Sequence, residues 1–232
     1  MKTALITGTN RGLGLEFVRQ YALDGWRVLA CTRNPSSSAE LNQLMKQYPG
    51  AVHVHALDVA NHEQIAHLSH ELAKEKIDLL INNAGVYPTM RGASFHQIDY
   101  EAWAYAFEVN AMAPLKMADA FYSQISKSES KKIITITSKM GSVADNRSGG
   151  SYVYRSSKSA VNIVMKSLAI DLESKGIIVA LLHPGWVRTD MGGANGLIST
   201  EKSVSGMRHV IKELIHTDTG KFFAYDGQII PW

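Results

Sequence analysis

Residues 7–14 read Thr7-Gly8-Thr9-Asn10-Arg11-Gly12-Leu13-Gly14, between an apolar run at 3–6 and a helical pattern. Three glycines at this place allow a tight turn and the close approach of a ligand, which side chains would prevent. A helix N-terminus presents unpaired N–H groups and a partial positive charge, so it favours a phosphate. The spacing differs from G-x-G-x-x-G, although the mechanics of phosphate binding are the same. A glycine-rich turn without a ligand is the alternative that the rest of the chain must exclude.

Apolar runs alternate with helical patterns along the whole chain. Strands are expected at 3–6, 27–33, 52–59, 77–81, 133–137, 177–182 and 221–224, and helices at 11–23, 38–45, 61–72, 99–125, 152–174 and 200–215. The strands are continuous apolar runs, so both faces of the sheet are expected to be buried. This pattern predicts an α/β protein with a doubly wound parallel sheet (Rossmann fold) of about seven strands, helices on both faces, and a single domain over residues 1–232.

Some residues predict where these helices begin and bend. Ser38 and Asn61 are placed to cap the second and third helices. Pro114 lies inside the long helix expected at 99–125 and should bend it.

Composition narrows the classes of function. The net charge of +3 is too small to indicate a nucleic-acid partner, and no apolar stretch approaches the length of a membrane span. The apolar run near the N-terminus is too short for a signal peptide, so we expect a cytoplasmic protein. Cys31, the single cysteine, forms no internal disulfide and is expected in the core.

Histidines form two pairs, His53 with His55 on a strand face and His67 with His70 on a helix face. Neither pair has a third ligand at a suitable spacing, so solvated faces are expected and no metal site is predicted.

Polar residues gather where the predicted strands end. These positions are 8–14, Arg33, Asp58, 82–85, Ser138 and 184–189. In a doubly wound sheet, ligands bind outside the carboxyl ends of the strands. We therefore expect these residues to meet at one edge of the sheet.

The helix that follows Ser138 opens with Tyr154-Arg155-Ser156-Ser157-Lys158. Residues four apart lie on one helix face, and a nearby ammonium favours the phenolate of a tyrosine. Tyr-x-x-x-Lys pairs are common on helices, where they usually have no function. Here the pair follows a serine on the ligand side of the sheet, which favours an acid–base role for Tyr154. Tyr152 is the rival tyrosine, but the residue four positions after it is Ser156 rather than a lysine.

Five motifs in this order resemble the short-chain dehydrogenase/reductase family over nearly the whole chain. They are Thr7-Gly8-x-x-x-Gly12-x-Gly14, Asn82-Asn83-Ala84-Gly85, Ser138, Tyr154-x-x-x-Lys158 and Pro184-Gly185. Residues 183–191 and 226–232 look most like the C-factor/sniffer carbonyl reductase branch of this family.

The resemblance implies a role for each matching residue. Tyr154 would exchange the proton of the carbonyl or alcohol oxygen. Lys158 would lower the Tyr154 pKa and bind the nicotinamide ribose. Ser138 would hold the carbonyl oxygen as charge develops. Asn110, inside the long helix, would hold a water that relays protons to Lys158. The chemistry of the residue alone also allows an alternative, in which Asn110 is a tolerated polar residue inside a helix without a catalytic role.

The same resemblance implies contacts with a nicotinamide dinucleotide. They are expected from Gly8, Asn10, Arg11, Gly12, Leu13, Gly14, Arg33, Asp58, Val59, Asn83, Ala84, Gly85, Tyr154, Lys158, Pro184, Gly185, Val187 and Thr189.

The end of the second strand indicates which dinucleotide binds. An NAD site needs an acidic residue there for the ribose 2′-hydroxyl, whereas this strand ends with Arg33 and the glycine turn carries Arg11. Guanidinium groups suit a 2′-phosphate, so NADP(H) is predicted. Two solvated surface arginines are the alternative.

One loop departs from the family pattern. The segment between Ser138 and Tyr154 is slightly longer than usual, and the extra residues around 144–151 are expected to reshape the pocket entrance rather than displace Ser138. Tyr87, Met140, Trp186 and Met191 flank the predicted site and could line an apolar pocket or belong to the core. The loops 87–98 and 191–203 are expected to shape that pocket, so the substrate itself is not predicted.

The sequence thus predicts an NADPH-dependent oxidoreductase that reduces a carbonyl group of an aldehyde, ketone or quinone to an alcohol. The alternative is a non-catalytic NADP(H)-binding protein with a signalling or redox-sensing role, which the C-factor resemblance suggests. An epimerase or dehydratase ranks third, because such enzymes usually have a larger C-terminal substrate region. The resemblance also implies a homodimer formed through the helices at 99–125 and 152–174.

Overall fold

Seven strands form one parallel sheet in the computed structural model, which describes residues 1–88 and 95–232. The strands are β1 (Thr3–Thr7), β2 (Arg27–Thr32), β3 (Val52–Ala56), β4 (Leu79–Asn82), β5 (Lys132–Ile136), β6 (Ile178–His183) and β7 (Phe222–Ala224). Their order across the sheet is β3-β2-β1-β4-β5-β6-β7, and every neighbouring pair is parallel. The order reverses between β1 and β4, which is the point where ligands bind in sheets of this type.

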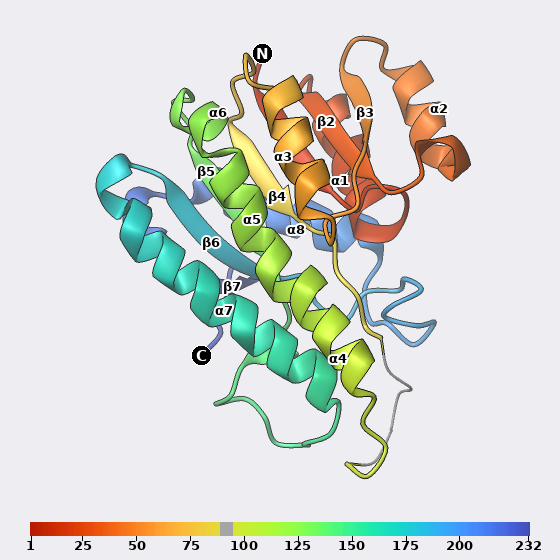
Figure 1. The fold of residues 1–232 in the computed structure, drawn as a ribbon, viewed down its shortest axis with the longest axis vertical. Helices are drawn as coiled ribbons and strands as arrows, with labels where there is room; N and C mark the ends of the chain where they lie inside the picture. Colours follow the sequence, from red (N-terminus) through yellow and green to blue (C-terminus); the bar gives the residue numbers. More distant parts are fainter. Residues whose placement is uncertain (89–94) are drawn as a thin grey trace.

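Helices cover both faces of the sheet (Figure 1). One face carries α1 (Gly12–Leu23), α2 (Ala39–Gln47) and α8 (Thr200–Glu213). The other carries α3 (His62–Glu71), α4 (Tyr100–Phe107), α5 (Ala113–Ala120) and α7 (Tyr152–Leu172), and the short α6 (Tyr122–Ser126) follows α5. The doubly wound architecture predicted from the sequence is therefore confirmed.

Strand residues point alternately into two hydrophobic cores. In β1, Leu5 packs with the core under α3, α5 and α7, whereas Ala4 and Ile6 pack with the core under α1, α2 and α8. All three side chains are fully buried, which explains why the strand reads as a continuous apolar run. Cys31 is 1% exposed and belongs to the first of these cores, as expected.

The single helix expected at 99–125 is wrong, because the chain there divides into α4, a π-helical segment at Glu108–Met112, α5 and α6. Proline has no N–H group, so Pro114 cannot donate to the carbonyl of Asn110 four residues earlier. A π-helical segment at this place changes the hydrogen-bond pattern of the backbone locally, while the α-helices on either side are kept. The break falls on Asn110, one of the predicted site residues.

Other elements differ from prediction at their ends. The third strand stops at Ala56 rather than at residue 59, and the second stops at Thr32 rather than at residue 33. Asn61 caps α3, because its side chain accepts the N–H of Gln64 at 3.0 Å. Ser38 precedes α2 as predicted, but its hydroxyl donates to the carbonyl of Asn34 instead of capping the helix. The loop expected at 87–98 includes residues 89–94, which lie outside the described part of the chain.

Candidate active site

The glycine turn after β1 lies against the end of β4. A Cβ added to Gly14 would stand 2.0 Å from the carbonyl oxygen of Gly8, and Gly8 itself has a φ of +69°. Both positions therefore require glycine. Asn83 fixes the turn, because its side chain donates to the carbonyls of Thr7 at 2.8 Å and Gly8 at 3.0 Å. The sequence motifs at 7–14 and 82–85 thus form one structural unit.

Helix α1 starts from this turn without a side-chain cap. Its N-cap residue is Arg11, which makes no capping hydrogen bond, and the first turn contains no acidic residue. The first N–H groups of α1 are therefore left to a ligand or to water, and they carry the partial positive charge of the helix dipole. The turn and helix start line a cavity of about 890 Å³, within the size range of cofactor sites.

This first cavity contains most of the predicted dinucleotide contacts. It is lined by Gly8, Asn10, Arg11, Gly12, Leu13, Gly14, Arg33, Asp58, Val59, Asn83, Ala84, Gly85, Tyr154, Lys158, Pro184 and Thr189. Gly185 and Val187 line a second cavity of about 560 Å³. Tyr154 and Thr189 line both cavities, so the two spaces adjoin at Tyr154. The turn, the strand ends and the start of α7 thus converge as the topology predicted.

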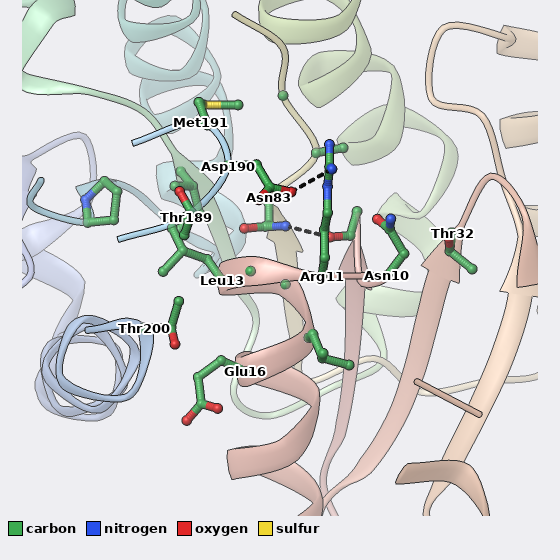
Figure 2. Close-up of a pocket in the computed structure, with 18 of the residues that line it drawn as sticks. Asn10, Arg11, Leu13, Glu16, Thr32, Asn83, Thr189, Asp190, Met191 and Thr200 are labelled. Carbon is green, nitrogen blue, oxygen red and sulfur yellow. Dashed lines mark hydrogen bonds and ion pairs between the residues drawn. The ribbon is translucent and has the colours of Figure 1, made fainter. Parts of the chain in front are cut away.

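The two predicted selectivity arginines have different surroundings. Figure 2 shows the Arg11 side chain reaching toward Asp190, and Arg11 Nη1 donates to Asp190 Oδ2 at 2.6 Å. Arg33 is exposed at the wall of the same cavity and pairs with no carboxylate among the described residues. Asp190 lines this cavity too. Asp190 could not be predicted as a site residue from the sequence, because only the tertiary structure brings it to Arg11.

Tyr154 and Ser138 stand side by side at the junction of the cavities. Tyr154 is 7% exposed and Ser138 is 8% exposed, and a hydrogen bond joins their side chains. The Ser138 hydroxyl also accepts the N–H of Met140 at 3.1 Å, which fixes its position. Tyr87 packs on Tyr154 with 4.4 Å between ring centroids. The rival Tyr152 is 44% exposed and lines neither cavity.

Burial dominates the electrostatics of the Tyr154–Lys158 pair. It raises the pKa of the Tyr154 phenol to about 12, although the hydrogen bond with Ser138 lowers that pKa. It also lowers the pKa of the Lys158 ammonium to about 8. The Lys158 Nζ lies 5.8 Å from the centroid of the Tyr154 ring and donates to the carbonyl of Ile136 at 3.0 Å. The lowering of the Tyr154 pKa by Lys158 that the sequence predicted is not found here, because desolvation of the phenolate raises that pKa and the group that lowers it is Ser138.

Asn110 lies behind this pair in the π segment and is 1% exposed. Its side chain accepts the N–H of Val86 at 2.8 Å, and it donates to the carbonyl of Val86 at 2.9 Å and to the Ser157 hydroxyl at 3.0 Å. Asn110 lines neither cavity. It connects the end of β4 to α7 one residue before Lys158.

The second cavity has an apolar wall formed by the four residues noted in the sequence, namely Tyr87, Met140, Trp186 and Met191. The loop expected to reshape the entrance also lines it, through Asp145, Arg147 and Ser148. His183 adds a ring whose pKa burial lowers to about 4, so it is neutral at pH 7. This cavity suits an apolar organic molecule next to the Tyr154 hydroxyl.

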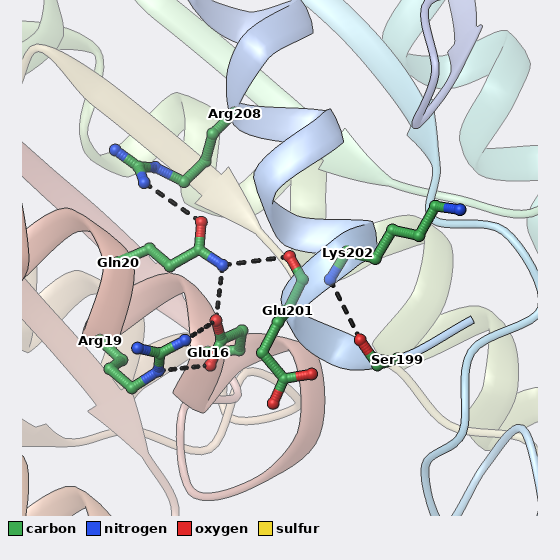
Figure 3. Close-up of polar contacts among 7 residues, drawn as sticks. All are labelled: Glu16, Arg19, Gln20, Ser199, Glu201, Lys202 and Arg208. Carbon is green, nitrogen blue, oxygen red and sulfur yellow. Dashed lines mark hydrogen bonds and ion pairs between the residues drawn. The ribbon is translucent and has the colours of Figure 1, made fainter.

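A polar network joins α1 to the start of α8 behind the first cavity (Figure 3). Gln20 Nε2 donates to the carbonyl of Glu201 at 3.2 Å, and its Oε1 accepts from Arg208 at 3.1 Å. Glu16 accepts two hydrogen bonds from Arg19. Because Glu16, Arg19 and Glu201 line the cavity, the network sets the distance between two of its walls.

Other observations bear on metals and membranes. Within residues 1–88 and 95–232, no group of three or more His, Cys, Asp or Glu side chains is arranged to hold a metal ion. His67 and His70 are exposed, but the expectation of a solvated face is wrong for His55, which is partly buried and lies 3.5 Å from Glu71. None of the helices in the described ranges is long and apolar enough to span a membrane.

Comparison with known proteins places this geometry in context. The sequence model of the family described as short chain dehydrogenase matches residues 2–197. The C-signal protein of Myxococcus xanthus is 40% identical over 67% of this chain and 93% of its own length. The NADPH-bound carbonyl reductase from chicken fatty liver is 30% identical, with a TM-score of 0.91 over 100% of this chain and 99% of that chain. Carbonyl reductase Sniffer of D. melanogaster is 31% identical, with a TM-score of 0.93 over 100% of both chains.

Proposed function

The chain belongs to the short-chain dehydrogenase family, and we propose that it reduces aldehydes, ketones or quinones to alcohols with NADPH, Tyr154 acting as the general acid. The chain is an NADP-dependent oxidoreductase of this family, and its similarity to the C-factor/sniffer branch is confirmed. One observation carries the proposal of carbonyl reduction. Tyr154 and its partner Ser138 stand where the cavity of the glycine turn meets the apolar second cavity.

In this proposal the substrate occupies the second cavity, with its carbonyl oxygen between Ser138 and Tyr154. The Ser138 hydroxyl donates to that oxygen as negative charge develops on it, and the Tyr154 hydroxyl gives it a proton. Burial keeps Tyr154 protonated at neutral pH, which is the state that a general acid needs. When bound in the first cavity, NADPH supplies the hydride. In the reverse direction Tyr154 takes the proton back.

Lys158 and Asn110 would restore the proton that Tyr154 gives away. The pKa of Lys158 near 8 allows its ammonium to give and regain a proton near neutral pH. Both amide N–H groups of the Asn110 side chain are already donated to Val86 and Ser157. Its backbone carbonyl lacks its α-helical donor because residue 114 is proline. We therefore assign the proposed water of the relay to the Asn110 carbonyl.

The residues of the first cavity fit a dinucleotide that carries a 2′-phosphate. The crowded contact of Gly14 with Gly8 and the uncapped start of α1 suit a pyrophosphate close to the backbone. Arg11 and Arg33 are the proposed ligands of the 2′-phosphate, since no acidic residue stands at the end of β2. Lys158 is the proposed contact of the nicotinamide ribose.

The test is NADPH consumption with a panel of aldehydes, ketones and quinones. Tyr154→Phe should lower kcat/KM by about 10²-fold or more, the usual contribution of a general acid. Tyr152→Phe is the matched control, because Tyr152 stands two residues earlier on α7 and outside both cavities. Failure of the whole panel, or full activity of Tyr154→Phe, would contradict the proposal.

A second candidate is a non-catalytic signalling or redox-sensing protein that binds NADP(H). The name of the C-signal relative favours it, whereas the complete set of Ser138, Tyr154 and Lys158 argues against it. Tight NADPH binding without turnover, and a cellular role that survives Tyr154→Phe, would support this candidate over the reductase.

Several sequence predictions await their own measurements. Three of them remain predictions: residues 1–232 form one domain, the protein is cytoplasmic, and it forms a homodimer. Size-exclusion chromatography with light scattering measures the oligomeric state, and one cooperative unfolding transition is expected of a single domain.

A further inference from the structure

Positive charge exceeds negative charge at the rim of the second cavity. Among the described residues that line it, Lys139, Arg147 and Arg155 are cationic, and Asp145 is the one acidic side chain. Asp145 forms an ion pair with Lys139, with 3.3 Å between Oδ1 and Nζ. One carboxylate thus stands against three cations, and both arginines have no carboxylate partner among the described residues.

The two arginines differ in what they contact. Arg155 donates to the carbonyls of Met140 at 3.3 Å and Gly149 at 3.2 Å and to the Ser148 hydroxyl at 2.8 Å. These neutral acceptors hold the guanidinium in place without cancelling its charge. Arg147 is exposed, and none of the described residues accepts a hydrogen bond from its guanidinium. Its donors are therefore open to a molecule at the cavity entrance.

The loop that carries Arg147 is held at both sides. The N–H of Ala144 donates to the carbonyl of Trp232 at 2.9 Å, and the Ser142 hydroxyl donates to the same carbonyl at 3.2 Å. On the other side, the side chain of Asn146 accepts the N–H of Gly149 at 3.0 Å. Such contacts reduce the entropy lost when the loop binds a ligand. The segment that is longer than usual in the family thus brings a fixed backbone and an unpaired cation to the substrate cavity.

We propose that the preferred substrates are aldehydes or ketones that carry a carboxylate, bound with the apolar body against Met140, Trp186 and Met191 and with the carboxylate at Arg147 and Arg155. The inference rests on the proposed carbonyl reductase function and names its substrate class. A carboxylate accepts the paired N–H groups of a guanidinium in a bidentate contact. A neutral substrate of the same shape would leave both positive charges to water.

The experiment compares 4-formylbenzoate with its methyl ester, which place the same aldehyde on the same ring and differ in charge. With NADPH, kcat/KM should be about 10-fold higher for the acid, the effect of roughly one good charge-assisted hydrogen bond. The ratio of acid to ester should approach 1 in Arg147→Gln and recover partly in Arg147→Lys. It should also fall as salt rises, because the rim is exposed. Arg147 is the chosen position because its side chain forms no hydrogen bond or ion pair with the described residues.

Lys175→Met is the matched control for net charge. Lys175 is exposed and lines neither cavity, so this variant loses one positive charge but should keep the wild-type ratio. The proposal is overturned if the wild-type acid-to-ester ratio of kcat/KM is at or below 1. It is also overturned if Arg147→Gln and Lys175→Met lower this ratio equally. In both cases, reduction of the ester would leave the carbonyl reductase function intact. If neither compound nor any member of the carbonyl panel is reduced, the proposed function fails as well.

Discussion

The guanidinium of Arg11 and the carboxylate of Asp190 meet at 2.6 Å, although 179 residues separate them in the chain. Arg11 stands in the turn after β1, and Asp190 follows β6, so the pair connects two sides of the first cavity (Figure 2). Their side chains are 66% and 74% exposed, which makes the ion pair weak and easily exchanged. A 2′-phosphate at Arg11 would therefore compete with Asp190 for the same donors.

We predict that Asp190→Asn binds NADPH about 1.4- to 5-fold more tightly, which corresponds to the roughly 0.2–1 kcal/mol of an exposed ion pair. The affinity for NADH should stay unchanged, because NADH lacks the 2′-phosphate that Arg11 is proposed to bind. Titration of each cofactor by fluorescence measures both values. Asp171→Asn is the control, since Asp171 is exposed and lines neither cavity. Weaker NADPH binding in Asp190→Asn would mean that Asp190 supports the cofactor instead of competing with it.

The double variant Arg11→Ala with Arg33→Ala should lose at least about 10-fold in NADPH affinity, since hydrogen bonds to charged groups contribute about 1.5–3 kcal/mol each. Its affinity for NADH should change by less than about 2-fold. The two dissociation constants, measured at equal ionic strength, give the change in selectivity. Equal losses for both cofactors would refute the assignment of these arginines to the 2′-phosphate.

The sequence predicted most of the features that depend on local pattern. Continuous apolar runs predicted a sheet buried on both faces, and the structure shows Leu5 in one core and Ile6 in the other. The glycine spacing predicted a turn that only glycine can form, as the contact of Gly14 with Gly8 explains. These features depend on residues close in sequence or on one periodic property, which a single chain displays.

Features that depend on distant partners could not be predicted in this way. The helical pattern at 99–125 continued through Asn110, because π segments have no simple sequence signature, and only Pro114 pointed to a disturbance. The position of Tyr154 beside Lys158 suggested a lowered phenol pKa, but helix spacing does not reveal how deeply both groups are buried. The pairing of Arg11 with Asp190 likewise follows from the way β6 and its loop pack, not from either local segment.

Lys158 links activity to stability through its pKa. That pKa is about 8 in the folded protein, against about 10.4 in an unfolded chain. Below pH 8 the Lys158 side chain is charged in both the folded and the unfolded protein, and the folded state bears the full free-energy cost of burying that charge. Between about pH 8 and 10.4 the unfolded chain binds more protons, so the free energy of unfolding rises with pH as this penalty disappears.

We therefore predict that the free energy of unfolding at pH 7 is higher for Lys158→Met than for the wild type, by on the order of 1–3 kcal/mol. The loss of the hydrogen bond to the carbonyl of Ile136 reduces this gain. The gain should shrink as the pH rises from 8 to 10, while reductase activity is lost at every pH. Urea unfolding across this range measures the difference. Lys166→Met, on the same helix and outside both cavities, is the control for the loss of one lysine. A gain that grows with pH would contradict this account of Lys158.

Pro114 provides a test of the proton relay at a residue that touches neither cavity. Alanine at this position restores an N–H group that can bond the carbonyl of Asn110 and take the place of the proposed water. Pro114→Ala should lower kcat several-fold, with KM nearly unchanged because the substrate contacts stay in place. Stability should fall only modestly, by roughly 0.4–1 kcal/mol, the usual effect of removing a proline from a position that it fits, since Pro114 lies in the first turn of α5, where proline is tolerated but not required.

The control is Pro49→Ala, which removes a proline from the exposed turn after α2. Steady-state kinetics and thermal melting of both variants separate an effect on the relay from a general effect of removing proline. If the relay passes through the Asn110 carbonyl, only Pro114→Ala loses kcat. An unchanged kcat would exclude that carbonyl from the relay and leave Lys158 to exchange protons by another route. A loss of kcat accompanied by a fall in melting temperature much larger than that of Pro49→Ala would instead mean that the break at Glu108–Met112 supports the fold around Asn110, and the relay assignment would then be wrong.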